Sequence, residues 1–149
     1  DVHAAFTGMF DSADLWDEAD GMLLIRLSQW WNEEGTIIDL TRQLVQENHP
    51  RRATEIIRNG VGYLAVENFI AMLEIVRETV ERVGAENFSS DALYETAQGF
   101  IFVVDGVQRY SFTPTKRYGA DCYGIQRADG ERKDLFRADP EWHVARLEP

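Results

Sequence analysis

Several features that mark particular classes of protein are scarce in this sequence. Its 149 residues include one cysteine, three histidines and four prolines, so an internal disulfide and a multi-cysteine metal site are both excluded. No uninterrupted apolar run approaches the roughly 20 residues of a membrane-spanning helix. The chain starts at residues 1–3 without an initiator methionine or a secretory signal pattern, so we expect its start to be a cut.

Basic residues are also few. Fifteen Lys and Arg stand against 26 Asp and Glu, which gives a net charge of −11. That charge repels a phosphate backbone, so we expect no nucleic acid among its partners. With 44% hydrophobic and 11% aromatic residues, the composition still predicts one ordinary folded core, and it excludes disordered, collagen-like and coiled-coil chains.

Local signals for enzymatic chemistry are missing as well. The histidines His3, His49 and His143 are far apart, and no His-x-x-x-His or Cys-x-x-Cys spacing occurs. Neither a Gly-x-Ser-x-Gly turn nor a glycine-rich phosphate loop is present. Cys122 has no histidine nearby and is best read as a small buried hydrophobe. The sequence therefore predicts no enzyme, no metal site and no cofactor.

In the first half of the chain, we expect one strand followed by two helices. A short apolar run predicts a strand at 22–28, after a loop or short helix at 11–20. Apolar residues at helical spacing predict a helix at 36–48, which ends before a proline, and a long helix at 54–83. Gly84 provides a suitable stop for the long helix.

The second half is richer in strands. Ser89 predicts the N-cap of a short helix at 92–98. β-Branched and alternating segments with two turn signals follow; the strands are expected at 100–104, 110–112 and 123–127, and the turns at Asp105-Gly106 and Asp129-Gly130. The polar tail from Glu131 is expected to wrap a surface. This order of elements predicts an α/β fold.

Aromatic and acidic residues gather where strands are expected to end, which is where open α/β sheets bind ligands. Trp30 and Trp31 follow the strand at 22–28, although one ring could belong to the core and the other to its rim. Phe10 and Asp11 follow a possible strand remnant at 4–6, where Asp11 could instead be solvated or cap a helix. A tyrosine near the start of the long helix could reach a cleft or cover the core edge. The ligand-binding candidates are Phe10, Asp11, Trp30, Trp31 and Tyr63.

Several motifs in this order resemble one family. They are Gly62-Tyr63-Leu64-Ala65-Val66-Glu67, the Ser-capped helix with Ala92-Leu93, Tyr110-Ser111-Phe112-Thr113-Pro114-Thr115, Arg117, Gly119-Ala120-Asp121, Gly124-Ile125-Gln126 and Asp129-Gly130-Glu131. The family is the branched-chain amino acid (Leu/Ile/Val) type of periplasmic binding protein, the type I solute receptors of ABC transporters. The resemblance covers about residues 8–130. Leu64 replaces a common aspartate and Thr113 a common serine.

This resemblance implies the C-terminal portion of a two-lobed, Rossmann-like receptor with an open parallel sheet. Residues 1–29 and 100–149 would form lobe 2 and hinge strands, and residues 30–99 would form lobe 1 helices. The ligand would be a small amino acid, amide or related metabolite, with its amino group near Asp11. The membrane permease of an ABC importer would be the partner, and the location periplasmic or extracellular, including a cell-surface lipoprotein.

Other readings remain open. The same fold serves as a ligand-sensing domain of signalling receptors or regulators, and a small enzyme without a local motif is a third reading. A second apolar set on the long helix lacks obvious partners in the chain, and the upstream strands of the family are absent from it. We therefore expect self-association of this piece, or binding to its missing half. The set comprises Leu64, Val66, Ile70, Leu73 and Ile75.

Overall fold

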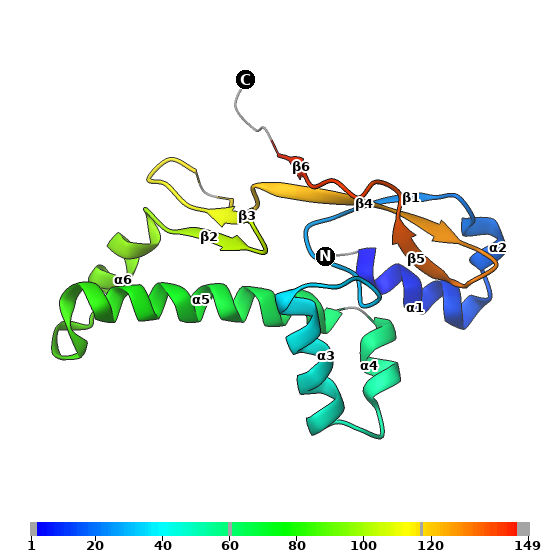
Figure 1. The fold of residues 1–149 in the computed structure, drawn as a ribbon, viewed down its shortest axis with the longest axis horizontal. Coiled ribbons are helices and arrows are strands. Elements are labelled where there is room, and N and C mark those ends of the chain that lie inside the picture. The colour runs from blue at the N-terminus through cyan, green and yellow to red at the C-terminus, as the bar shows by residue number, and fades with distance from the viewer. Residues whose placement is uncertain (1–2, 60, 117, 146–149) are drawn as a thin grey trace.

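The computed structural model describes residues 3–59, 61–116 and 118–145, except for the side chains of residues 3–6, 59 and 61–64. Helices and strands are arranged along an elongated molecule (Figure 1). The helices are α1 (His3–Ala13), α2 (Trp16–Ala19), α3 (Thr36–Asn48), α4 (Ala53–Asn59), α5 (Val61–Val83), the 3₁₀ helix η1 (Ala85–Asn87) and α6 (Ser90–Ala97). The strands are β1 (Leu23–Arg26), β2 (Ile101–Val104), β3 (Val107–Ser111), β4 (Cys122–Asp129), β5 (Asp134–Arg137) and β6 (His143–Val144).

Strand β4 organises the main sheet and runs from the neighbourhood of β3 toward α2 (Figure 1). It pairs with β1 on one edge and β5 on the other, and its first residues pair with β6. Every pairing between the described strands is antiparallel, so the parallel pairing implied by the resemblance does not occur among them. The polar tail, which was expected to wrap a surface, forms β5 and β6. Both strands pair with β4, so their backbone groups join the hydrogen bonding of the sheet.

The turn predicted at Asp105-Gly106 is confirmed. Both residues have positive φ, +50° and +76°, as a tight two-residue hairpin turn between β2 and β3 requires. The Asp105 carboxylate then accepts hydrogen bonds from the backbone N–H and the hydroxyl of Thr36, at 2.9 and 2.6 Å. Because Thr36 begins α3, this aspartate caps the helix from a distant part of the chain.

Two apolar cores lie along the molecule. The first joins α1, α2, β1, α3, α4, β4 and β5, and its buried residues are Phe10, Trp16, Ala19, Leu24, Trp30, Ile38, Ile57, Ala128 and Leu135. The second joins α3, α5 and the β2–β3 hairpin, and its buried residues are Ile37, Ala71, Phe100, Phe102 and Tyr110. Adjacent residues Ile37 and Ile38 of α3 enter different cores, so α3 links the two packing units.

Most element predictions hold, and two are wrong. Helix α3, the Ser89-capped α6 and strands β1, β2 and β4 lie where the sequence places them, and Ser89 Oγ accepts the N–H of Ala92 at 3.2 Å. Strand β3 begins at Val107, earlier than the expected 110–112, and β5 and β6 were not expected. Residues 4–6 belong to α1 rather than to a strand, because the alanines there favour a helix. The long helix predicted at 54–83 is instead two helices, α4 and α5, which run in different directions (Figure 1) on either side of residue 60, a residue outside the described ones.

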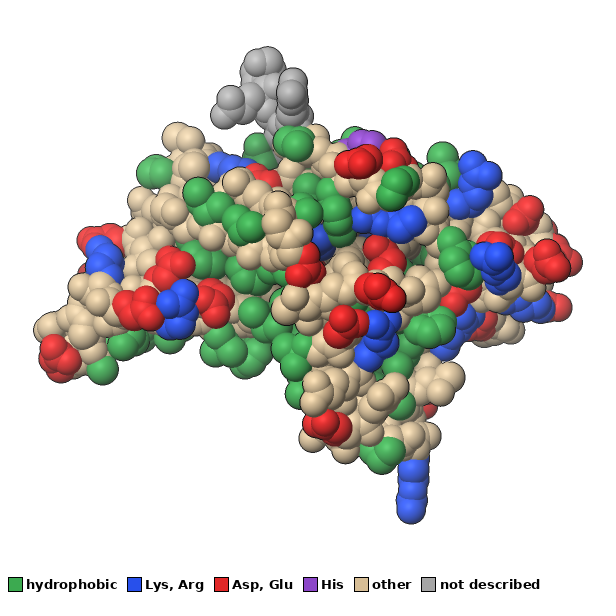
Figure 2. Space-filling model, viewed as in Figure 1, with side chains coloured by type: hydrophobic (Ala, Val, Ile, Leu, Met, Phe, Trp, Pro, Cys, Tyr) green, Lys and Arg blue, Asp and Glu red, His purple; other side chains and the backbone are tan. Residues whose placement is uncertain are grey.

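The apolar set of α5 that was expected to lack partners is partly covered, and other apolar residues of the helix are exposed instead. Val66, Ile70 and Ile75 pack against the second core, because the β2–β3 hairpin covers that side of the helix. Leu64 lies among the residues whose side chains are not described. Phe69, Met72 and Leu73 are 55%, 48% and 46% exposed, and hydrophobic side chains gather along the free edge of α5 in Figure 2. Over the described residues, no helix is long and apolar enough to cross a membrane.

Candidate functional site

Five side chains from four segments form one polar cluster, in which Arg58 pairs with two carboxylates. We call Asp11, Trp30, Trp31, Arg58 and Asp134 the Arg58 cluster. Asp11 comes from α1, Arg58 from α4 and Asp134 from the start of β5, while the two tryptophans follow β1. The Thr7 hydroxyl also donates to the carbonyl of Arg58 at 3.2 Å, which fixes α4 against α1.

Asp134 is the buried carboxylate of this cluster, with 8% of its side chain exposed. Its Oδ1 accepts the indole N–H of Trp30 at 2.7 Å and that of Trp31 at 3.3 Å. Its Oδ2 lies 3.1 Å from Arg58 Nη1. A buried carboxylate needs such donors, because desolvation otherwise disfavours its charge. One acidic side chain thus orients both indole rings.

Arg58 joins the two carboxylates of the cluster. Its Nη2 donates to Asp11 Oδ1 and to the carbonyl of Lys133, both at 2.8 Å, and its Nε lies 3.3 Å from Asp11 Oδ2. The guanidinium also lies 5.7 Å from the centre of the Trp16 ring. This fork of donors matches the bidentate geometry in which arginine holds carboxylates most strongly.

The structure brings four of the five predicted ligand-binding residues into one region. Phe10 and Trp30 are 8% and 0% exposed and belong to the first core, whereas Trp31 is only partly buried and packs at its edge. Asp11 stands on α1, not on a loop, with 40% of its side chain exposed. Tyr63 lies in the first turn of α5, and its side chain is outside the described set, so its ligand contact stays a prediction.

The ionisation of Asp11 responds to this setting. Partial burial acts to raise the pKa of Asp11, but hydrogen bonds from Arg58 and Trp16 and the charges of Arg58 and Lys133 hold it below the ordinary value. A lowered pKa in the folded state means that ionised Asp11 stabilises the fold above its unfolded pKa, near 4, and that this stability disappears as the pH falls.

We expect the free energy of unfolding to fall on acidification from pH 6 to pH 3, and Asp11→Asn to remove part of that fall. Because Asp11 is partly exposed, its share is at most about 1 kcal/mol. Urea unfolding of both proteins at several pH values measures this difference. Identical pH profiles for the two proteins would contradict the stabilising role of the Asp11 carboxylate.

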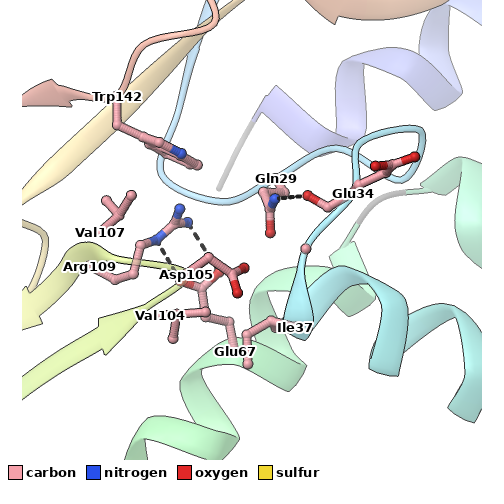
Figure 3. Close-up of a pocket in the computed structure, with 10 residues that line it drawn as sticks. Gln29, Glu34, Ile37, Glu67, Val104, Asp105, Val107, Arg109 and Trp142 are labelled. Carbon is pink, nitrogen blue, oxygen red and sulfur yellow. Dashed lines mark hydrogen bonds and ion pairs between the residues drawn. The ribbon is translucent and has the colours of Figure 1, made fainter.

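A separate pocket lies beside the β2–β3 hairpin and the start of α3, with a volume of about 370 Å³ (Figure 3). Trp142 forms one wall and the β2–β3 hairpin another. Gln29, Glu34 and Asp105 add polar groups, and Gln29 Nε2 donates to the carbonyl of Glu34 at 2.5 Å. Its volume falls in the range of small-molecule sites.

A buried ion pair forms the floor of this pocket. Arg109 Nε lies 3.1 Å from Glu67 Oε1, and both side chains are 5% exposed. Burial raises the pKa of Glu67, against the opposing effect of Arg109. The guanidinium also lies 3.7 Å from the centre of the Trp142 ring, and its Nη2 donates to the carbonyl of Leu27 at 2.5 Å. Arg109 therefore ties β3 to α5, to the residue that follows β1, and to the tail.

The sequence reasoning did not find this pocket or the partners of Asp11. Glu67, Arg109 and Trp142 are distant along the chain, and none stands in a motif that specifies a pair. Arg58 and Asp134 each lie among many other charges. The helical pattern gave no signal for Glu67, because it places this carboxylate away from the apolar stripe, whereas the structure buries it.

Comparison with known proteins gives one match at the level of structure. A crystal structure of a branched chain amino acid ABC transporter from Thermus thermophilus with bound valine matches this chain with a TM-score of 0.61 and 18% sequence identity. The match covers 87% of this chain and 34% of the other, so the chain spans about a third of that protein's length. No protein-family model and no curated protein matches the sequence. The chain has the α/β fold of part of a type I periplasmic binding protein, as the resemblance of its motifs predicts.

Proposed function

We propose that this chain is part of an extracellular solute-binding receptor of an ABC importer, which captures a small amino acid, an amide or a related metabolite. The fold match over 87% of the chain carries this proposal, because the matched protein is an amino acid ABC transporter with valine bound. Fold alone does not fix function, so the assignment depends on the residues that would hold a ligand.

The Arg58 cluster is the ligand-binding region in this proposal. Asp11 supplies an exposed carboxylate for the amino group of the ligand, and Trp31 supplies a partly buried indole that donates to Asp134 of the same cluster. Phe10 and Trp30 support these two from the core, and Tyr63 of α5 stays a proposed ligand contact, because its side chain lies outside the described residues. Charge-assisted hydrogen bonds to a carboxylate suit an ammonium group, and an aromatic wall suits its apolar side chain.

Capture by closure of two lobes is part of this proposal. In it, residues 1–29 and 100–149 belong to lobe 2 and the hinge, and residues 30–99 to lobe 1. Each of the two apolar cores joins side chains from both ranges. The β2–β3 hairpin packs on α5, so β4 is the segment that carries the chain back toward β1. A ligand held between lobes stabilises their closed arrangement. The closed receptor would then deliver its ligand to a membrane permease, from the periplasm or the outer cell surface.

Replacement of Asp11 tests this assignment. In the full-length receptor, we expect Asp11→Asn to weaken binding of the ligand by about 2 kcal/mol, because a charge-assisted contact with the ammonium group is lost. Asp91→Asn is the matched control, since Asp91 is an exposed aspartate in the first turn of α6, at the other end of the molecule from α1 (Figure 1). Calorimetry that finds the same Kd for wild type and Asp11→Asn excludes Asp11 from the binding site.

The isolated 149-residue chain should bind the same ligand poorly. If the whole receptor binds near 1 μM, or about −8.2 kcal/mol, loss of about half of the contacts leaves a Kd in the millimolar range. NMR titration of the chain measures such weak binding directly. Micromolar binding by the chain alone would mean that it holds both walls of the site, in contradiction to the two-lobe assignment.

A further inference from the structure

The Arg58 guanidinium pairs with two carboxylates, Asp11 and Asp134, and the ion pair with Asp11 is the easier one to break. Asp134 is 8% exposed, and its other oxygen accepts both tryptophan N–H groups. Asp11 is 40% exposed, and its other described donor is the indole N–H of Trp16 at 2.9 Å. Separation from Asp134 would leave a buried charge without its counter-ion, whereas separation from Asp11 exposes a carboxylate to water.

The charges of the cluster do not balance. Two carboxylates face one guanidinium, and the nearby Lys133 ammonium pairs instead with Asp14 at 2.8 Å. Arg58 is also held by the carbonyl of Lys133 at 2.8 Å, so it keeps an anchor on the β5 side when Asp11 withdraws. One negative charge is therefore available for a second cation beside Arg58.

We propose that Arg58 is a built-in competitor for the ligand at Asp11. Without ligand, its guanidinium occupies the Asp11 carboxylate; when an ammonium group binds there, Arg58 remains on Asp134 and the Lys133 carbonyl. This proposal rests on the proposed function for the choice of ligand, but the exchange itself requires only a small cation. Arg58 thereby lowers the affinity for a ligand amino group and keeps the empty site closed by an internal ion pair.

The test uses the complete 149-residue chain, labelled with ¹⁵N, and methylammonium chloride as the probe. The indole N–H resonance of Trp16 reports on Asp11, and that of Trp31 reports on Asp134. We expect methylammonium to shift the Trp16 signal with saturation and to shift the Trp31 signal much less. Sodium chloride at the same ionic strength controls for screening. Equal shifts of both signals by the two salts would overturn the proposal.

Two variants give opposite expected results. Lysine at position 58 keeps the charge beside Asp134 but cannot bridge both carboxylates, so Arg58→Lys should tighten methylammonium binding about threefold. Arg52→Lys is the control, because Arg52 makes an exposed ion pair with Glu55 and contacts neither Asp11 nor Asp134 through any described ion pair. Asp134→Asn removes the anchoring charge, leaves Arg58 to Asp11 alone, and should weaken methylammonium binding. If either folded variant changes the affinity in the opposite direction or not at all, Arg58 is not a competitor.

A parallel titration with L-valine separates this proposal from the proposed function. If methylammonium behaves as expected and valine does not bind, the exchange stands and valine capture by this chain fails. If valine binds while Arg58→Lys leaves both affinities at the wild-type value, the binding proposal stands and the competitor role fails. The dispersion of the indole resonances shows in the same spectra that each variant is folded.

Discussion

Arg109→Met is expected to lower the free energy of unfolding by about 3–5 kcal/mol, because it leaves the buried Glu67 carboxylate without its counter-ion. Arg109 also stacks on Trp142 and donates to the carbonyl of Leu27, so the substitution loosens contacts between three segments. Chemical denaturation of wild type and variant at pH 7 measures the effect.

Two further variants identify the cause. Arg77→Met removes an arginine that pairs with Glu74 and Glu81 on the exposed side of α5, and it should cost less than about 1 kcal/mol. The double variant with methionine at both 67 and 109 should recover much of the lost stability, since no buried charge remains. A loss for Arg109→Met no larger than that for Arg77→Met would contradict the importance of the buried pair.

Phe69→Glu is expected to convert self-associated chain into monomer. Phe69, Met72 and Leu73 form an exposed apolar face on α5, and in a solution of this chain alone only a second copy can cover it. Burial of about 400 Å² of such surface contributes roughly 10 kcal/mol before the entropy of association is subtracted. A glutamate in its centre should raise the dimer dissociation constant at least about tenfold, since burying one unpaired charge costs several kcal/mol.

Met9→Glu is the matched control for this experiment. Met9 is 52% exposed on α1, at the other end of the molecule from the free end of α5 (Figure 1). Light scattering over a concentration series should show association for wild type and Met9→Glu and its loss for Phe69→Glu. A wild-type chain that stays monomeric at high micromolar concentration would show that the α5 face needs no cover.

Much of the fold could be predicted because its signals are local. The periodicity of α3, the Ser89 cap and the Asp105-Gly106 turn each depend on residues close in sequence, and each is confirmed. The position of Cys122 as a buried side chain also follows from its surroundings, and it is 4% exposed. Such features depend on backbone sterics and on short-range hydrogen bonds.

The candidate site depends on contacts across the chain and could be predicted only in part. Trp30 and Trp31 were expected at a strand exit, with one ring in the core and one at its rim as the alternative, and burial follows that alternative. Their shared acceptor, Asp134, lies 104 and 103 residues away. With 26 acidic residues in the chain, composition could not indicate which carboxylate would be the partner of Arg58.

A structure of the chain with a bound amino acid tests the central claim most directly. Crystals grown or soaked with L-valine at several times its Kd would show where the ligand binds. We predict density for the ligand ammonium group within hydrogen-bond distance of Asp11, with Arg58 separated from Asp11 and still paired with Asp134. Ligand density in the pocket lined by Glu67, Arg109 and Trp142, with Asp11 still paired to Arg58, would contradict the assignment of the site.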